Sequence, residues 1–153
     1  MSTRDAKRWL FPRALLAFMA LPGVVAFYLP WAMRPVGTPA PAGWLPFVAG
    51  IVVLLWCVKD FYVSGAGTLA PWSPPRHLVR TGLYRFSRNP MYVGVLAILL
   101  GWALLYETRT LWLYLVGVAA LFQIRVVLFE EPWLARTHGE EWTQYRARVR
   151  RWL

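Results

Sequence analysis

Residues 90–129 read PMYVGVLAILLGWALLYETRTLWLYLVGVAALFQIRVVLF, two apolar runs that only the short polar link at residues 107–109 separates. A helix of about 20 residues crosses the roughly 30 Å hydrocarbon layer of a bilayer, and both runs approach that length. Three residues can join two helices only as antiparallel neighbours. The stretch therefore predicts a helical hairpin within a membrane.

Two more apolar blocks precede this hairpin, so the sequence predicts an all-α membrane protein with about four transmembrane helices. Pro22 and Gly23 predict a kink in the first of them, and the Pro-rich linker at residues 34–42 predicts an exposed loop. After Pro132, arginines alternate with aromatic and aliphatic residues, which predicts an amphipathic helical tail that Gly139 divides in two. The expected spans are residues 12–32, 43–63, 90–106 and 110–131, in a single membrane domain of residues 1–153.

The charge distribution supports this topology. The 153 residues are 58% hydrophobic and 16% charged, whereas soluble domains carry about a quarter charged residues. Of the seventeen Lys and Arg, the four-span arrangement places only Arg34 and Arg109 on one side of the membrane. The positive-inside rule then predicts that both termini are cytoplasmic. The net charge of +10 lies in these flanks and loops, which argues against a nucleic-acid partner.

One polar segment directly precedes the predicted third span. Residues 76–94 read RHLVRTGLYRFSRNPMYVG, and Asn89 followed by Pro90 is typical of an N-cap and first turn. The helix should therefore begin there, with Asn89 as its cap. Its free N–H groups, beside Arg88, would attract a carboxylate or a phosphate.

The adjacent acids Glu130 and Glu131 fall at the predicted cytoplasmic end of the fourth span. Like charges adjoin there, and a helix C-terminus disfavours anions, so a cation is expected nearby. Either arginines of the chain, such as Arg125 or those of the tail, or the ammonium group of a ligand could supply it. Gln123 lies seven residues before Glu130 on the same helical face, and we expect it to face the bundle interior or a neighbouring helix.

Taken together, LVRTGLYRFSRNPMYVG, the acid pair and the tail HGEEWTQYRARV resemble the isoprenylcysteine carboxyl methyltransferase-like and phospholipid methyltransferase-like integral membrane methyltransferases. The resemblance covers residues 76–153, about half of the chain. It implies a site for S-adenosylmethionine between the last two helices and the cytoplasmic segments. The cofactor-binding residues predicted here are His77, Leu78, Val79, Tyr84, Arg88, Asn89, Pro90, Met91, Tyr92, Glu130 and Glu131; no metal site is predicted.

The resemblance implies methyl transfer from S-adenosylmethionine to a lipophilic acceptor in the lipid bilayer. The family has histidine where this chain has Asn89, so no imidazole can act as a base at that position, and the sequence identifies no catalytic residue. Two other functions stay open. The chain could be a non-catalytic small transporter or assembly subunit, or it could be a nicotinamide-dependent membrane reductase, for which it is short.

Overall fold

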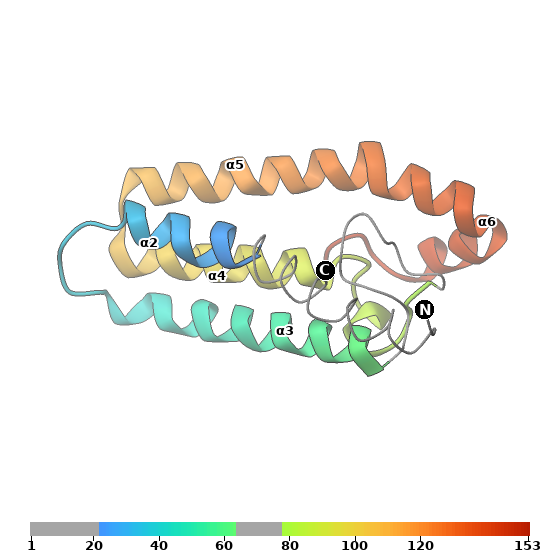
Figure 1. Cartoon of the computed structure of the whole chain (residues 1–153), viewed down its shortest axis with the longest axis horizontal. Helices are drawn as coiled ribbons and strands as arrows, with labels where there is room; N and C mark the ends of the chain where they lie inside the picture. The colour runs from blue at the N-terminus through green and yellow to red at the C-terminus, as the bar shows by residue number, and fades with distance from the viewer. Residues whose placement is uncertain (1–21, 64–77) are drawn as a thin grey trace, which may run out of the picture.

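The computed structural model describes residues 22–63 and 78–153, and every named element in this part of the chain is helical (Figure 1). The predicted all-α fold is thus confirmed there, whereas residues 12–21 of the first expected span lie outside the described residues. The elements in chain order are η1 (Val24–Tyr28), α2 (Leu29–Met33), η2 (Pro41–Gly43), α3 (Trp44–Val63), η3 (Gly82–Arg85), α4 (Pro90–Tyr106), α5 (Arg109–Arg125), η4 (Val126–Glu130) and α6 (Glu131–Arg148).

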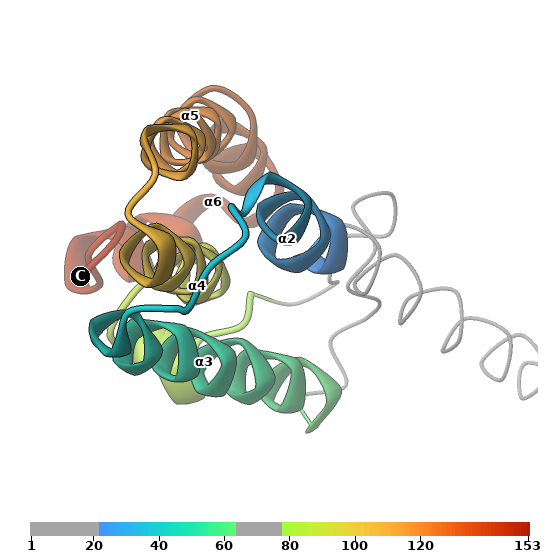
Figure 2. The same ribbon diagram turned by 90° about the vertical axis from the view of Figure 1, so that its left-hand side faces the viewer.

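Helix α4 is the centre of the bundle. It lies between α3 and α5, with α2 beside it, and α6 folds across one end (Figure 2). The bounds of α4 coincide with the predicted span at 90–106. Among the described residues, two helical stretches are long and apolar enough to cross a membrane, Pro41–Asp60 and Arg109–Arg148, while Val24–Met33 and Pro90–Tyr106 are apolar but shorter.

The outer faces of α3 and α5 are apolar. Leu45 on α3 is 81% exposed, and Leu113 and Val116 on α5 are each more than 60% exposed. Apolar side chains along whole helices would be costly in water but suit contact with lipid chains. The surface of the bundle therefore agrees with the membrane environment predicted from the sequence.

Paired glycines bring α3 and α4 together. A Cβ on Gly50 would lie 2.6 Å from the Gly94 carbonyl oxygen, and one on Gly43 would lie 2.5 Å from that of Gly101. Gly43 at the end of η2 and Gly50 on α3 are seven residues apart, as are Gly94 and Gly101 on α4, so each two lie on one face. Gly43 meets Gly101 and Gly50 meets Gly94, which is an antiparallel register. Since lipid is as apolar as the side chains, membrane helices associate through this kind of close backbone packing.

Gly23 has helical φ and ψ of −62° and −46°. The turn before Pro22 lies outside the described residues, so the kink expected at Pro22 and Gly23 stays a prediction. A second proline, Pro30, lies further along this helix. Pro30 has no N–H, and the wide turn of η1 precedes it, so the carbonyls of Val25 and Ala26 lose their helical donors. Neighbouring helices replace them. The Trp102 Nε1 donates to the Ala26 oxygen and the Tyr114 hydroxyl to the Val25 oxygen, each at 2.9 Å.

The chain does not leave its helix at the acid pair. It continues from α5 through η4, a π-helical turn, into α6, so the expectation that Glu130 and Glu131 end the fourth helix is wrong. The break lies further on, at Gly139, whose φ of 47° and ψ of −116° are not helical. The predicted division of the tail at Gly139 is confirmed.

We expect Gly50→Ala to destabilise the protein by about 1–3 kcal/mol, because its methyl group would overlap the α4 backbone and force the helices apart. Gly117→Ala on α5 is the matched control, since a Cβ there meets no atom within 4 Å. It should be neutral or slightly stabilising. Thermal unfolding in detergent, followed by circular dichroism, measures both. Equal effects of the two variants would contradict the close α3–α4 contact.

Candidate functional site

Helix α4 begins where the sequence predicts, but its cap differs. Pro90 is the first helical residue, and Asn89 occupies the N-cap position without a side-chain capping bond. Instead, the Asn89 Nδ2 donates to the Arg151 carbonyl oxygen at 2.9 Å, and the Asn89 N–H donates to the Ser87 Oγ at 3.1 Å. Asn89 is thus the N-cap residue as predicted, but its side chain makes no capping bond, and its amide nitrogen binds a segment 62 residues later.

The two acids point to different partners although they are adjacent. Successive helical residues are turned by about 100°, and the wider π-helical turn of η4 directly precedes Glu131. Glu130 accepts hydrogen bonds from the Tyr92 hydroxyl and, at 2.8 Å, from the Arg125 Nε. Glu131 pairs instead with Arg88 and Arg151. The repulsion expected between two adjoining carboxylates is thus offset by separate donors.

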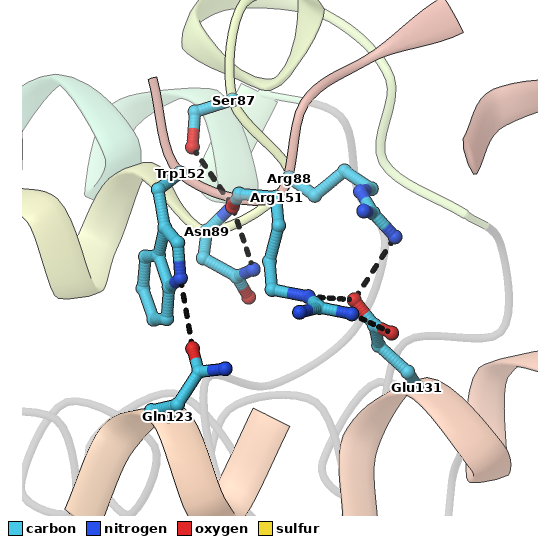
Figure 3. Close-up of polar contacts among 7 residues, drawn as sticks. All are labelled: Ser87, Arg88, Asn89, Gln123, Glu131, Arg151 and Trp152. Atoms are coloured by element: carbon cyan, nitrogen blue, oxygen red, sulfur yellow. Dashed lines mark hydrogen bonds and ion pairs between the residues drawn. The ribbon is translucent and has the colours of Figure 1, made fainter. Parts of the chain in front are cut away.

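Glu131 is the centre of a buried ion cluster (Figure 3). The Arg88 Nη1 donates to its Oε1 at 3.0 Å, and Arg151 binds both oxygens, Nε to Oε1 at 2.8 Å and Nη2 to Oε2 at 3.0 Å. The side chains of Arg88 and Glu131 are only 9% and 10% exposed. Burial lowers the pKa of Arg88, while the hydrogen bond to Glu131 raises that of Arg151.

One donor of this cluster lacks an acceptor. Among the described residues, the buried Arg88 Nε has no hydrogen-bond partner. Its guanidinium carbon lies 5.4 Å from the centre of the Trp142 ring, a cation–π contact that does not satisfy the N–H. Unpaired buried donors are rare in folded proteins. The Arg88 Nε is therefore suited to an oxygen that is not part of the chain.

The surroundings of Glu130 are more open and aromatic. Its side chain is 31% exposed and that of its partner Arg125 is 51% exposed. Tyr92 stacks on Phe122 with ring centres 4.4 Å apart, and the Trp152 ring lies 6.5 Å from Tyr92. A carboxylate beside aromatic faces is an arrangement that binds organic cations.

We call the segment that follows α6, residues 149–153, the strap. It runs along the start of α4, where Ser87 and Arg150 form a parallel β-bridge and the Arg88 N–H donates to the Arg150 oxygen at 2.9 Å. The Trp152 Nε1 donates to the Gln123 Oε1 at 2.9 Å (Figure 3). Gln123 is exposed and bonded to the strap. Our expectation that it faces the bundle interior or a neighbouring helix is wrong.

The remaining predicted residues form a separate apolar cluster. Val79 and Tyr84 are buried with Cys57 of α3, and Met91 packs against them. The Tyr145 hydroxyl of α6 donates to the Tyr84 carbonyl oxygen at 2.7 Å, and the Asp60 carboxylate accepts from the Leu83 N–H at 3.3 Å. Leu78 is partly buried, and His77 lies outside the described residues.

The structure thus brings the start of α4 and the acid pair together, as the sequence led us to expect, through the contacts of Arg88 and Tyr92. Between them lie two side chains of the strap, Arg151 on Glu131 and Trp152 beside Tyr92. Sequence reasoning counted the tail arginines among the possible partners of the acids but missed the roles of Ser87, Arg151 and Trp152. Only the alternation of arginine with aromatic residues hinted that the tail would return to the bundle.

Comparisons with known proteins identify a family for the chain. Residues 40–141, which make up two thirds of the chain, match the phospholipid methyltransferase family. An uncharacterized protein of Haemophilus influenzae is 33% identical over 63 residues, which make up 41% of this chain and 100% of that protein. No solved structure matches the chain significantly.

Glu131→Gln should destabilise the fold by about 3 kcal/mol, because it leaves the buried Arg88 and the partly buried Arg151 without their counter-charge. Glu141→Gln is the matched control, since Glu141 pairs with Arg80 at the surface and its side chain is 50% exposed. That change should cost about 1 kcal/mol or less. Unfolding in detergent reports both, and similar losses would show that Glu131 is not the centre of a buried cluster.

Proposed function

Because the chain belongs to the phospholipid methyltransferase family, we propose that it transfers a methyl group from S-adenosylmethionine to a lipophilic acceptor in the membrane. The observation that carries this proposal is the contact between the start of α4 and the acid pair, Arg88 with Glu131 and Tyr92 with Glu130. Membership in a methyltransferase family also argues against a transporter, an assembly subunit or a reductase.

The polar residues of the site fit the charges of the methyl donor, which carries a carboxylate, an ammonium group and a sulfonium. The Arg88 Nε is a buried donor that lacks an acceptor among the described residues, and a carboxylate oxygen would satisfy it. Glu130, the more exposed acid, suits the ammonium group or the ribose hydroxyls. The Tyr92 ring, stacked on Phe122, offers a π face to the sulfonium.

Other predicted residues would complete the cofactor site. Asn89 and Pro90 form the start of α4, and Glu131 becomes available to a ligand only when Arg151 moves away from it. Leu78 and Met91 are partly buried and offer apolar surface that suits the nucleoside, while Val79 and Tyr84 are buried and join the set through the resemblance. His77 joins this set on the resemblance alone.

The cofactor would supply a methyl group bound to a sulfonium, whose methyl carbon accepts an electron pair of the acceptor as the carbon–sulfur bond breaks. For such a step the protein aligns the two reactants, which can contribute about 7–11 kcal/mol, and excludes water. Asn89 cannot take a proton, and its amide is bonded to the Arg151 oxygen. An amine or thiolate acceptor would fit a site without a strong base at that position.

The proposed topology has four spans, with both termini and the cofactor site on the cytoplasmic side. The distribution of Lys and Arg supports it, since only Arg34 and Arg109 fall at the other end. A polar cofactor would then enter from the cytoplasm, and an apolar acceptor from the bilayer between the helices. That separation of entry routes explains why such an enzyme lies within the membrane.

S-adenosylhomocysteine, the demethylated product of the donor, should bind the purified protein in detergent. Glu130→Gln should weaken binding by about tenfold or more, because it removes a charged acceptor. Glu140→Gln, an exposed acid on α6 that accepts from the Gln144 side chain, should leave binding unchanged. Isothermal titration calorimetry measures the dissociation constant for the native protein and for both variants. Absence of binding at millimolar ligand would overturn the proposed function.

A second test concerns the acceptor. Incubation of the protein in native lipid membranes with isotopically labelled S-adenosylmethionine should transfer label into the organic phase on lipid extraction. Glu130→Gln should reduce this transfer and Glu140→Gln should not, because only the first change touches the site. Label that stays entirely in the aqueous phase would contradict a lipophilic acceptor.

A further inference from the structure

The strap binds the same groups of the site that a zwitterionic ligand would need. Its carbonyl oxygens accept hydrogen bonds at the start of α4, from the Arg88 N–H at 2.9 Å and from the Asn89 Nδ2 at 2.9 Å. The Ser87 hydroxyl donates to the Arg151 oxygen at 3.4 Å. These acceptors bind donors directly beside the Arg88 side chain, whose Nε we assign to the carboxylate of a bound ligand.

The other half of the strap carries the opposite charge. The Arg151 guanidinium binds both oxygens of Glu131, and the Trp152 indole donates to Gln123 (Figure 3). The centre of the Trp152 ring lies 6.5 Å from that of the Tyr92 ring. The strap therefore presents acceptors to α4, a cation to the acid pair and an aromatic surface to Tyr92. S-adenosylmethionine has the same polarity, with a carboxylate, an ammonium group and an adenine ring.

Few apolar side chains anchor the strap: Val149 and Trp152 are half-buried, and Leu153 is exposed. Arg150 and Leu153 are exposed, Leu153 at 79%, and the Arg151 side chain is 31% exposed. Its backbone leaves α6 in an extended conformation at Val149, with φ of −117° and ψ of 132°. Segments held by a few partly exposed polar contacts open at a small fraction of the global unfolding free energy.

This inference rests on the proposed function. We propose that the strap is an intramolecular competitor of the cofactor: the strap occupies the site through Arg151 and dissociates from it when the donor binds. Displacement would free Glu131 and the donors at the start of α4 together. Arg88 remains on Glu131 in both states, so the buried acid keeps a counter-charge while the strap moves.

A reversible lock tests this inference. Ser87 and Arg150 are bridge partners, and neighbouring strands lie about 4.8 Å apart, within the range of roughly 4.4–6.8 Å between Cα atoms that a disulfide needs. Ser87→Cys with Arg150→Cys, in a Cys57→Ala background that removes the one native cysteine, would hold the strap in place when oxidised. Mass spectrometry confirms the bond.

The oxidised protein should bind S-adenosylhomocysteine at least about tenfold more weakly than the same protein after reduction. In the otherwise native chain, Arg151→Gln should tighten binding by about tenfold, because the competing cation is lost while Glu131 keeps Arg88. Arg148→Gln, which removes a positive charge from an exposed position on α6, is the matched control and should leave binding unchanged.

The outcomes separate the two proposals. One outcome is that the native chain binds S-adenosylhomocysteine while the oxidised and reduced forms of the double-cysteine variant bind it equally, or while Arg151→Gln weakens binding. In either case the strap is a fixed part of the scaffold, and only the competitor inference fails. If no form binds the ligand, including the native chain, the proposed function fails and the competitor inference fails with it.

Discussion

The carboxylate of Glu131 joins three segments that lie far apart in the sequence. Arg88 reaches it from the start of α4 and Arg151 from the strap, while Glu131 itself opens α6. Two guanidinium groups share one buried carboxylate, so removing the acid would leave two cations without a partner. The cluster thereby fixes the end of the bundle where α6 folds back, and it places Trp142 of α6 against Arg88.

A different kind of contact holds the bundle itself. Between helices in lipid there is little hydrophobic driving force, so close packing and satisfied backbone groups decide the arrangement. The paired glycines supply the close packing between α3 and α4. Trp102 and Tyr114 supply the hydrogen bonds that the helix loses at Pro30. These contacts do not involve the polar cluster at the end of the bundle, so the exchange of partners proposed for that cluster would leave them intact.

Local signals predict the fold well and the site only in part. The Asn89–Pro90 pair and the link at 107–109 set both ends of α4, because each acts on its own neighbours in the chain. The helix does not end at the acid pair, since a π-helical turn lets the chain continue into α6. Contacts such as that of Asn89 with Arg151 depend on how the tail folds back, and no local pattern contains that information.

An exchange of ligand for strap would conserve charge, and this explains how the acid pair can exist without a ligand. The strap offers one guanidinium to Glu131 and carbonyl oxygens to the start of α4. A zwitterionic donor would replace a cation with a cation and acceptors with acceptors, so the groups that the strap satisfies would stay paired after the exchange. Glu130, which Tyr92 and Arg125 contact in the strap-bound structure, is then the acid that suits the ribose hydroxyls. The carboxylate of a free ligand carries a full charge where the strap has only neutral carbonyls, and the unpaired Arg88 Nε favours the charged group.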